Sequence, residues 1–413
     1  MAQCLLLRNV FYNLVTVVKK TGEAITALIL DVLSKNGILI KFCRGQGYDN
    51  CSNMKGLYGG VQALILKENP LAKFSPCACH SLNLCGVHAA ESCTDAKTFF
   101  GFAQELYNVF SCSPQRWEIL KNIVGSSLHS MSQTRWSARL DSIRPIVEHY
   151  PKIIKALEDV KNLNLTSECL SRVNGILTYM KTFKCLLLSH IWLKILTPID
   201  QVNRVLQARK STIDWEVKNL NSLNDQMTEI KAQWPEMLNN AKSSAVLYEI
   251  EPTLLEKRTR KIIHFHDESP DEPVTGTPEE VFKINTFNVI VERVQSELGK
   301  RYDDVRELNK SFSFLWNYMD MSEDEITKSA TSFIAEYSVD VSNDLTEEVL
   351  FLKNIHIANF GNATLRAIKL LSKIYELKLS SMFPNCCIAL HLFCTLPVTW
   401  SIFDRSLYLR FYL

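Results

Sequence analysis

The sequence predicts a small α/β head followed by a long helical body. In the first hundred residues, short apolar runs typical of buried strands alternate with segments of helical periodicity, which favours a partly parallel sheet. From about residue 97 onward, apolar residues recur mainly at helical spacing. The length of 413 residues is enough for two or three packed units of this kind.

The head is expected to open with a strand within Cys4 to Val18, where β-branched and aromatic side chains are frequent. A helix then starts at Thr21-Gly22 and ends at Asn36-Gly37, a left-handed cap signal. Ile38 to Cys43 predicts a second buried strand, and Arg44 to Asp49 a glycine-rich turn. The predicted head is completed by a helix over Val61–Lys67, a strand over Phe74–Cys79 and a helix over Leu82–Cys93.

The body is predicted to consist of helices separated by one exposed linker. The linker covers about residues 265–281, where acidic side chains and prolines are concentrated. The segments with helical periodicity are Phe99–Phe110, Ile143–Leu157, Val173–Lys194, Val202–Ala208, Phe282–Leu298 and Thr346–Leu379.

Composition restricts the class of protein. Forty-six basic and forty-four acidic residues give a net charge of +2, so overall charge indicates neither a nucleic-acid nor a membrane partner. Thirteen cysteines, an odd number in a long chain, favour a reducing compartment, either nucleus or cytoplasm. The apolar N-terminal stretch is interrupted by Arg8, Asn9 and Asn13, which argues against a signal peptide or membrane span.

Cysteine and histidine residues are concentrated between Cys43 and Cys112. Two interpretations stay open for them: a zinc site, or small thiols packed in a core beside a hydrogen-bonded histidine. The spacing of the downstream residues is irregular, whereas zinc sites are usually built from two spaced pairs. The candidate ligands are Cys77, Cys79, His80, Cys85, His88 and Cys93.

Asp49 is the strongest single candidate for a functional carboxylate. It follows a predicted buried strand in a loop that is rich in glycine, and ligands in open α/β sheets bind at such strand ends. The alternative is a purely local role as an Asx-turn residue. The loop is not a phosphate-binding loop, because no Gly-Lys-Ser/Thr follows it.

Two further segments carry cationic side chains that could bind nucleic acid. Arg135-Trp136 pairs a guanidinium with a large aromatic ring, a combination that can hold a phosphate and stack on an unpaired base. The alternative is a tryptophan packed at a helix start. The basic run Lys257 to Lys261 is either a nuclear-import patch or a solvated face.

Taken together, several motifs resemble hAT-family transposases, including the relatives called zinc finger MYM-type protein 1-like. The resemblance runs in order along the whole chain. The motifs that carry it are Cys43–Gly56 (CRGQGYDNCSNMKG), Gly60–Gln62 (GVQ), Pro76–Leu84 (PCACHSLNL), Thr134–Arg139 (TRWSAR), Phe383–Asn385 (FPN) and Thr395–Thr399 (TLPVT).

The resemblance implies an RNase H-like core interrupted by a large all-helical insertion. In this chain we expect an incomplete core over residues 1–112, the insertion over 113–380, and a truncated C-terminal core and dimerisation segment over 381–413. The family holds two divalent metals, Mg²⁺ or Mn²⁺, with an Asp, Asp and Glu set for phosphodiester cleavage.

The resemblance also assigns roles to individual residues. Asp49 matches the second carboxylate of the set. Cys77 and His80 match the Cys-x-x-His pair beside the active site. Arg135 and Trp136 match the pair that stabilises a flipped base and a hairpin DNA end.

Two departures from the pattern predict that the metal site is vestigial. The first Asp is expected upstream of this chain's first apolar strand, and Asp404 stands where the third carboxylate, a Glu, is expected. We therefore expect a transposon-derived, catalytically inactive protein that keeps dimerisation and nucleic-acid-binding surfaces. The expected partners are a second copy, related hAT-type proteins and DNA, with no membrane and no small-molecule substrate.

Two alternatives remain. One is a metal-dependent transposase or nuclease fragment whose missing carboxylate is encoded upstream, in a truncated gene model, or is supplied by a larger assembly. The other is a degraded remnant without a stable fold, because an RNase H sheet that has lost strands exposes unpaired backbone groups. The expected compartment is the nucleus, or otherwise the cytoplasm.

Overall fold

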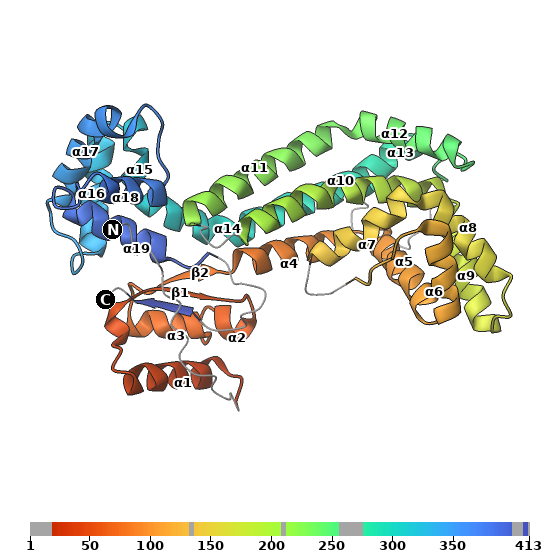
Figure 1. The fold of residues 1–413 in the computed structure, drawn as a ribbon, viewed down its shortest axis with the longest axis horizontal. Helices are drawn as coiled ribbons and strands as arrows, with labels where there is room; N and C mark the ends of the chain where they lie inside the picture. The colour runs from red at the N-terminus through yellow and green to blue at the C-terminus, as the bar shows by residue number, and fades with distance from the viewer. Residues whose placement is uncertain (1–18, 132–135, 208–211, 256–275, 399–407, 412–413) are drawn as a thin grey trace, which may run out of the picture. The chain divides into compact units, whose positions relative to one another are not determined.

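The computed structural model describes residues 19–131, 136–207, 212–255, 276–398 and 408–411 (Figure 1). Within these residues the protein is mostly helical and carries one small sheet. The chain forms two compact units: unit 1 contains Met1–Ser81, Arg204–Asn221 and Lys300–Leu413, and unit 2 contains Leu82–Asn203 and Ser222–Gly299. The strand predicted within Cys4 to Val18 lies outside the described residues.

Unit 1 contains the sheet, which has the strand order β2-β1-β3. β1 (Cys43–Tyr48) pairs in parallel with β2 (Lys73–Pro76), so that Tyr48 lies opposite Pro76. On its other side β1 pairs antiparallel with β3 (Tyr408–Phe411). The parallel pair confirms the α/β character that was predicted for the head.

The position of β1 corrects one prediction. Ile38 to Cys43 is not a strand: it contains a short 3-10 helix, Ile40–Phe42, in which Phe42 is exposed. The strand is instead Cys43–Tyr48, the segment that was predicted to be a glycine-rich turn, and all six of its residues are buried. Apolar content alone therefore indicated the wrong segment.

Contacts with distant residues explain why this polar, glycine-containing segment is the strand. The Gln46 side chain donates to the carbonyl oxygens of Ala72, at 2.8 Å, and Gln62, at 3.2 Å. A Cβ atom on Gly45 would lie 3.1 Å from Cδ of Pro397, so glycine allows close approach of that segment. None of these partners is close to β1 in the sequence.

Three helices lie on one side of the sheet in unit 1 (Figure 1). They are α1 (Gly22–Lys35), α2 (Ser52–Lys55) and α3 (Val61–Glu68). α1 and α3 confirm the predicted helices. Their buried side chains join those of the sheet in one apolar core formed by Ile25, Ile29, Leu33, Cys43, Tyr48, Met54, Val61, Ile65 and Ala72.

Between residues 314 and 395, unit 1 consists of helices and their connections. Its core is aromatic: the rings of Phe333 and Tyr337 stack with centroids 4.5 Å apart, and Trp316 lies 4.5 Å from Phe393. The helices are α15 (Phe314–Asn317), α16 (Glu323–Glu336), α17 (Leu345–Phe360), α18 (Ala367–Glu376) and α19 (Pro384–Thr395).

Unit 2 is entirely helical within the described residues. Its core includes fully buried Trp192, whose ring packs edge-on against Phe100 at 4.6 Å. α4, α10, α11 and α14 each contribute residues to both units. The helices are α4 (Ala78–Ala90), α5 (Thr94–Ser111), α6 (Pro114–Val124), α7 (Trp136–Glu148), α8 (Tyr150–Lys161), α9 (Ser167–Met180), α10 (Phe183–Leu206), α11 (Ile213–Ala232), α12 (Trp234–Leu247), α13 (Pro278–Phe282) and α14 (Val289–Phe312).

The end of the predicted linker is helical rather than exposed coil. α13 begins at Pro278, and Thr277 caps it: the Thr277 hydroxyl accepts from the Glu280 backbone N–H, and the Glu280 carboxylate accepts from the Thr277 N–H. Glu279 and Glu280, two of the acidic residues that indicated a linker, are therefore in the first turn of a helix. Residues 265–275 of the predicted linker lie outside the described residues.

Within the described residues, no single helix is long and apolar enough to cross a membrane. One pair of consecutive helices, α9 and α10, meets the length and composition criteria together, but the pair is bent by 75° at its break.

Candidate functional site

Asp49 lies at the end of β1, where this strand pairs in parallel with β2. Asp49 directly follows β1 and is exposed. A position after a buried strand was predicted for it, although the strand was expected at Ile38 to Cys43. Its Oδ1 atom accepts a hydrogen bond from the backbone N–H of Cys51 at 3.3 Å, which is an Asx-turn. The local role and the strand-end position therefore occur together at this residue, and the second carboxylate oxygen keeps its accepting capacity for a ligand.

Cys51 is the side chain in closest contact with Asp49. Its Sγ donates to Asp49 Oδ1 at 2.5 Å. Partial burial, together with the hydrogen bond and the negative charge of Asp49, raises the pKa of the Cys51 thiol to about 11. At neutral pH Cys51 is therefore a protonated donor to the carboxylate and not a thiolate nucleophile.

The turn from β2 into α4 brings the Cys-x-x-His pair to the same end of the sheet. The Cys77 N–H donates to the Tyr48 carbonyl oxygen at 3.1 Å, which joins this turn to the last residue of β1. The Asn50 side chain donates to the hydroxyl of Ser81 at 2.7 Å. The segment was predicted to stay extended to Cys79 and to become helical at Leu82, but α4 already begins at Ala78.

His80 lies within electrostatic range of Asp49. Burial lowers the pKa of His80, the charge of Asp49 opposes this shift, and the cation of Arg301 adds to it. The effect of burial on the pKa is larger than that of Asp49, so the imidazole is neutral at pH 7. The structure thus brings together Asp49, Cys77 and His80, three of the residues that the sequence singled out.

A fourth group near this turn, Glu216 of α11, was missed by the sequence analysis. Glu216 is fully buried, and neither carboxylate oxygen has a hydrogen-bond partner among the described residues. Burial raises the pKa of Glu216 well above its usual value, so the group is a neutral acid. Its charge, if formed, would raise the pKa of the buried Cys79 thiol, which places the two groups in the same interior.

A sequence signal for Glu216 exists. It occupies a position on the apolar face of α11, in register with buried Ile213, Leu220 and Leu223. A carboxylate on an otherwise apolar helical stripe is a rare arrangement and marks a buried titratable group.

The described residues test only part of the predicted nucleic-acid and metal sites. Arg135 and Asp404 lie outside them; Trp136 begins α7, but its side chain is not described. Further along α7, the guanidinium of Arg139 lies 4.8 Å from the centre of the Phe100 ring. The nucleic-acid role of Arg135 and Trp136 therefore remains a prediction.

No group of three or more His, Cys, Asp or Glu side chains in the described part of the chain is arranged to hold a metal ion. Of the candidate zinc ligands, Cys77, Cys79 and Cys85 are buried, as the thiol-packing alternative requires. His88 Nδ1 lies 3.0 Å from a carboxylate oxygen of Glu297 in unit 2. The donors next to Asp49, a thiol and an imidazole, also do not fit Mg²⁺, which prefers several oxygen ligands.

The fold and site define a mostly helical protein with a small α/β part and an exposed carboxylate at a strand end. Residues 5–60 match the family model described as ZMYM1/FAM200, RNase-like domain. The matched segment includes α1, β1 and Asp49. The match supports a transposase-derived protein similar to the ZMYM1/FAM200 group, in agreement with this part of the sequence resemblance.

Proposed function

We propose that this protein is a transposase-derived binding protein of the hAT type, which keeps an RNase H-like architecture without phosphodiester chemistry. On this proposal, β1, β2 and the surrounding helices of unit 1 are the remainder of the catalytic core. The insertion predicted over residues 113–380 then includes most of unit 2 and, from unit 1, the helices α15 to α18. The partners are DNA and a second copy of the chain, and the compartment is the nucleus.

The observation that supports this proposal most directly is the chemistry around Asp49. Two-metal phosphodiester cleavage needs several carboxylate oxygens that clamp both metals and the reacting phosphate. Asp49 is instead hydrogen-bonded by the Cys51 thiol and lies near neutral His80, which has the cation Arg301 beside it. The imidazole and guanidinium groups can donate to a phosphate-bearing partner, whereas the Cys51 thiol already donates to Asp49.

The match at residues 5–60 supports the family part of the proposal, because it covers the segment that positions Asp49. Mg²⁺ or Mn²⁺ would bind at Asp49 only weakly, as a vestige of the ancestral site. Asp404, with a side chain one methylene shorter than the expected Glu, would add little to this affinity.

The test uses the full chain with a labelled DNA hairpin and a supercoiled plasmid, each with Mg²⁺ and with Mn²⁺. We expect binding of the hairpin that weakens in Arg135→Ala and Trp136→Ala, and no nicking of the plasmid. Metal-dependent cleavage that disappears in Asp49→Ala would refute the proposed loss of chemistry.

The position of Asp49 favours one alternative, a metal-dependent nuclease or transposase fragment. Ligands and metals in open sheets bind beyond the carboxyl ends of parallel strands, and Asp49 follows such an end. In that case both Asp49→Ala and Asp404→Ala would abolish cleavage, whereas Asp141→Ala, a control in α7, would leave it unchanged.

The proposed self-association and the alternative of a degraded remnant are separated by light scattering and circular dichroism. A folded protein with a mass about twice the 47.2 kDa of the chain supports the proposal. A chain with little helical signal, or an aggregate of no defined mass, indicates the remnant.

A further inference from the structure

Five serine or threonine residues of this chain directly precede a proline. Proline has no backbone N–H and a fixed φ, so an enzyme can select such a pair with an apolar pocket that offers no acceptor. Protein kinases of the proline-directed class select their substrates in this way, and many of them also require a cation three residues after the hydroxyl. The five pairs are Ser75-Pro76, Ser113-Pro114, Thr197-Pro198, Ser269-Pro270 and Thr277-Pro278.

Ser113 is the one of the five that also has the cation. The third residue after it is Arg116, whose guanidinium is always charged and can pair with a carboxylate of the kinase. The sequence Ser113-Pro-Gln-Arg116 therefore meets both requirements. The residues at the corresponding place in the other four pairs are Ala78, Asp200, Glu272 and Glu280.

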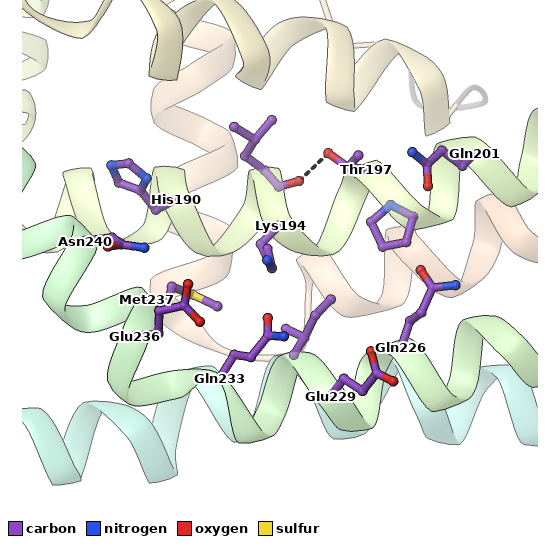
Figure 2. Close-up of a pocket in the computed structure, with 13 residues that line it drawn as sticks. His190, Lys194, Thr197, Gln201, Gln226, Glu229, Gln233, Glu236, Met237 and Asn240 are labelled. Carbon is purple, nitrogen blue, oxygen red and sulfur yellow. Dashed lines mark hydrogen bonds between the residues drawn. The ribbon is translucent and has the colours of Figure 1, made fainter.

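The structure excludes two of the other pairs for a second reason. Ser75 is in β2 and is 1% exposed. Thr197 is inside α10, where it lines an open pocket and its hydroxyl donates to the Leu193 carbonyl oxygen at 2.7 Å (Figure 2). A phosphorylated hydroxyl must reach the γ-phosphate of ATP in the kinase cleft, which neither a buried strand nor a helix interior allows. Ser269 lies outside the described residues.

Ser113 is accessible at the start of α6. Its backbone is extended, with φ −146° and ψ 124°, and the side chain is half-buried between exposed neighbours. Pro114 has no N–H, and the N–H groups of Gln115 and Arg116 belong to the first turn, which has no preceding helical carbonyl groups. The first helical bond is from the Trp117 N–H to the Ser113 carbonyl oxygen at 2.9 Å. Few backbone hydrogen bonds therefore have to break before a kinase can bind this segment as an extended chain.

Two donors of Arg116 have weak acceptors in the unmodified chain. The backbone N–H donates to Ser113 Oγ at 3.5 Å, which is long for a hydrogen bond. The guanidinium Nη1 donates to Cys169 Sγ at 3.2 Å, and sulfur is a weak acceptor. A phosphate oxygen on Ser113 would be a stronger acceptor for both groups.

We propose that Ser113 is a phosphorylation site for a proline-directed kinase that selects a cation at the third following residue. In the transfer, Ser113 Oγ forms a bond to the γ-phosphorus of ATP, and the bond from that phosphorus to the bridging oxygen of ADP breaks. The hydroxyl proton passes to the catalytic aspartate of the kinase, and ADP leaves. The site lies in unit 2 and uses neither Asp49 nor the Cys-x-x-His pair, which belong to unit 1.

The phosphate then caps α6. Its negative charge is stabilised at the N-terminus of a helix, where it accepts from the Arg116 N–H and pairs with the Arg116 guanidinium. Release of this guanidinium from Cys169 leaves α6 held more firmly at its own first turn. Amides of Pro114–Val124 should therefore exchange with solvent about two- to fivefold more slowly after phosphorylation, the effect of one favourable charge in the first turn.

The test uses the folded full chain with Mg²⁺, ATP and a purified cyclin-dependent kinase as the probe of this class. We expect phosphate at Ser113, mapped by mass spectrometry, at a rate at least about tenfold higher than at Thr277. Ser113→Ala should remove this label. Arg116→Ala should slow it at least about tenfold, whereas Arg116→Lys, which keeps the charge, should retain most of the rate.

A matched control is Arg172→Ala, which removes an exposed arginine of α9 that pairs with Glu168. It should leave the rate at Ser113 unchanged. Circular dichroism checks that each variant keeps its helical signal. Hydrogen exchange compares the phosphorylated with the unphosphorylated chain, and α12 (Trp234–Leu247) serves as the reference helix whose exchange should stay the same.

Absence of phosphate at Ser113 in the folded chain would overturn the proposal, and a synthetic peptide of residues 109–118 would show whether the sequence or the fold is the cause. Equal rates in the wild type and Arg116→Ala would also overturn it, as would faster labelling of Thr277 than of Ser113. Unchanged exchange of Pro114–Val124 after phosphorylation would refute the proposed cap.

Discussion

Asp340 is the residue whose replacement should most strongly disturb the strand that carries Asp49. It forms a buried pair with Arg44 of β1, in which both side chains are 5% exposed. Arg44 Nε donates to Asp340 Oδ2 at 2.7 Å and Nη2 donates to Oδ1 at 2.8 Å. Arg44 Nη1 also donates to the carbonyl oxygens of Lys41, at 2.7 Å, and Cys43, at 3.0 Å.

The expected magnitude follows from what each replacement leaves behind. Asp340→Ala leaves a buried guanidinium with two unpaired donors, and loss of one partner from such a pair costs about 3–5 kcal/mol of unfolding free energy. Replacing both partners, Arg44→Met with Asp340→Leu, removes the buried charges together. The double variant should therefore be less destabilised than the sum of its own single variants, Arg44→Met and Asp340→Leu, by at least about 2 kcal/mol.

Hydrogen exchange measured by mass spectrometry on peptides covering Cys43–Tyr48 tests this locally, without assuming that the whole chain unfolds in one step. A loss of 3 kcal/mol corresponds to roughly 150-fold faster exchange of the β1 amides. Asp320→Ala, at an exposed residue of the turn Tyr318–Asp320, is the control. Exchange in Asp340→Ala within about fivefold of the wild type, or additive effects in the double variant, would refute the reasoning.

Two further predictions concern titratable groups. Because the folded-state pKa of Glu216 is raised above its unfolded value near 4.5, its contribution is fully present below that value and is lost as pH rises toward the folded-state pKa. Glu216→Gln should therefore reduce the fall in urea midpoint between pH 5 and pH 8, and an unchanged pH slope would contradict this. The Cys51 thiol, with its pKa raised to about 11, should react slowly with iodoacetamide at pH 8. Asp49→Asn should accelerate the reaction several-fold, measured by mass spectrometry against exposed Cys112 as internal reference, and an unchanged ratio would show that Asp49 does not control the thiol.

The sequence was sufficient for elements that depend on local periodicity and caps. α1 and α3 were predicted within a few residues, because apolar spacing and the Asn36-Gly37 end signal act over a single turn. β1 could not be located in this way. Its polar residues are buried because they have hydrogen-bond acceptors in the interior. Arg44 donates to the Asp340 carboxylate, and Gln46 donates to the carbonyl oxygens of Gln62 and Ala72. No local sequence pattern reveals these partners.

The candidate site could likewise be predicted only where it depends on a local sequence pattern. Asp49 was located because a strand end followed by a polar loop is a recurrent ligand position, even though the strand itself was shifted along the chain. The hydrogen bond from Cys51 follows from its place two residues later. Glu216 could not be assigned to the site, because only the packing of α11 brings it near Cys79.

The pairing of β1 with β3 has a consequence for biosynthesis. Residues 43–48 leave the ribosome about 360 residues before their partner strand 408–411 does, which at roughly 5–20 residues per second amounts to about 20–70 s. During this interval one edge of β1 has no partner from its own sheet, and such edges recruit other strands. The nascent chain should therefore depend on chaperones that shield this edge until residues 408–411 have been synthesised.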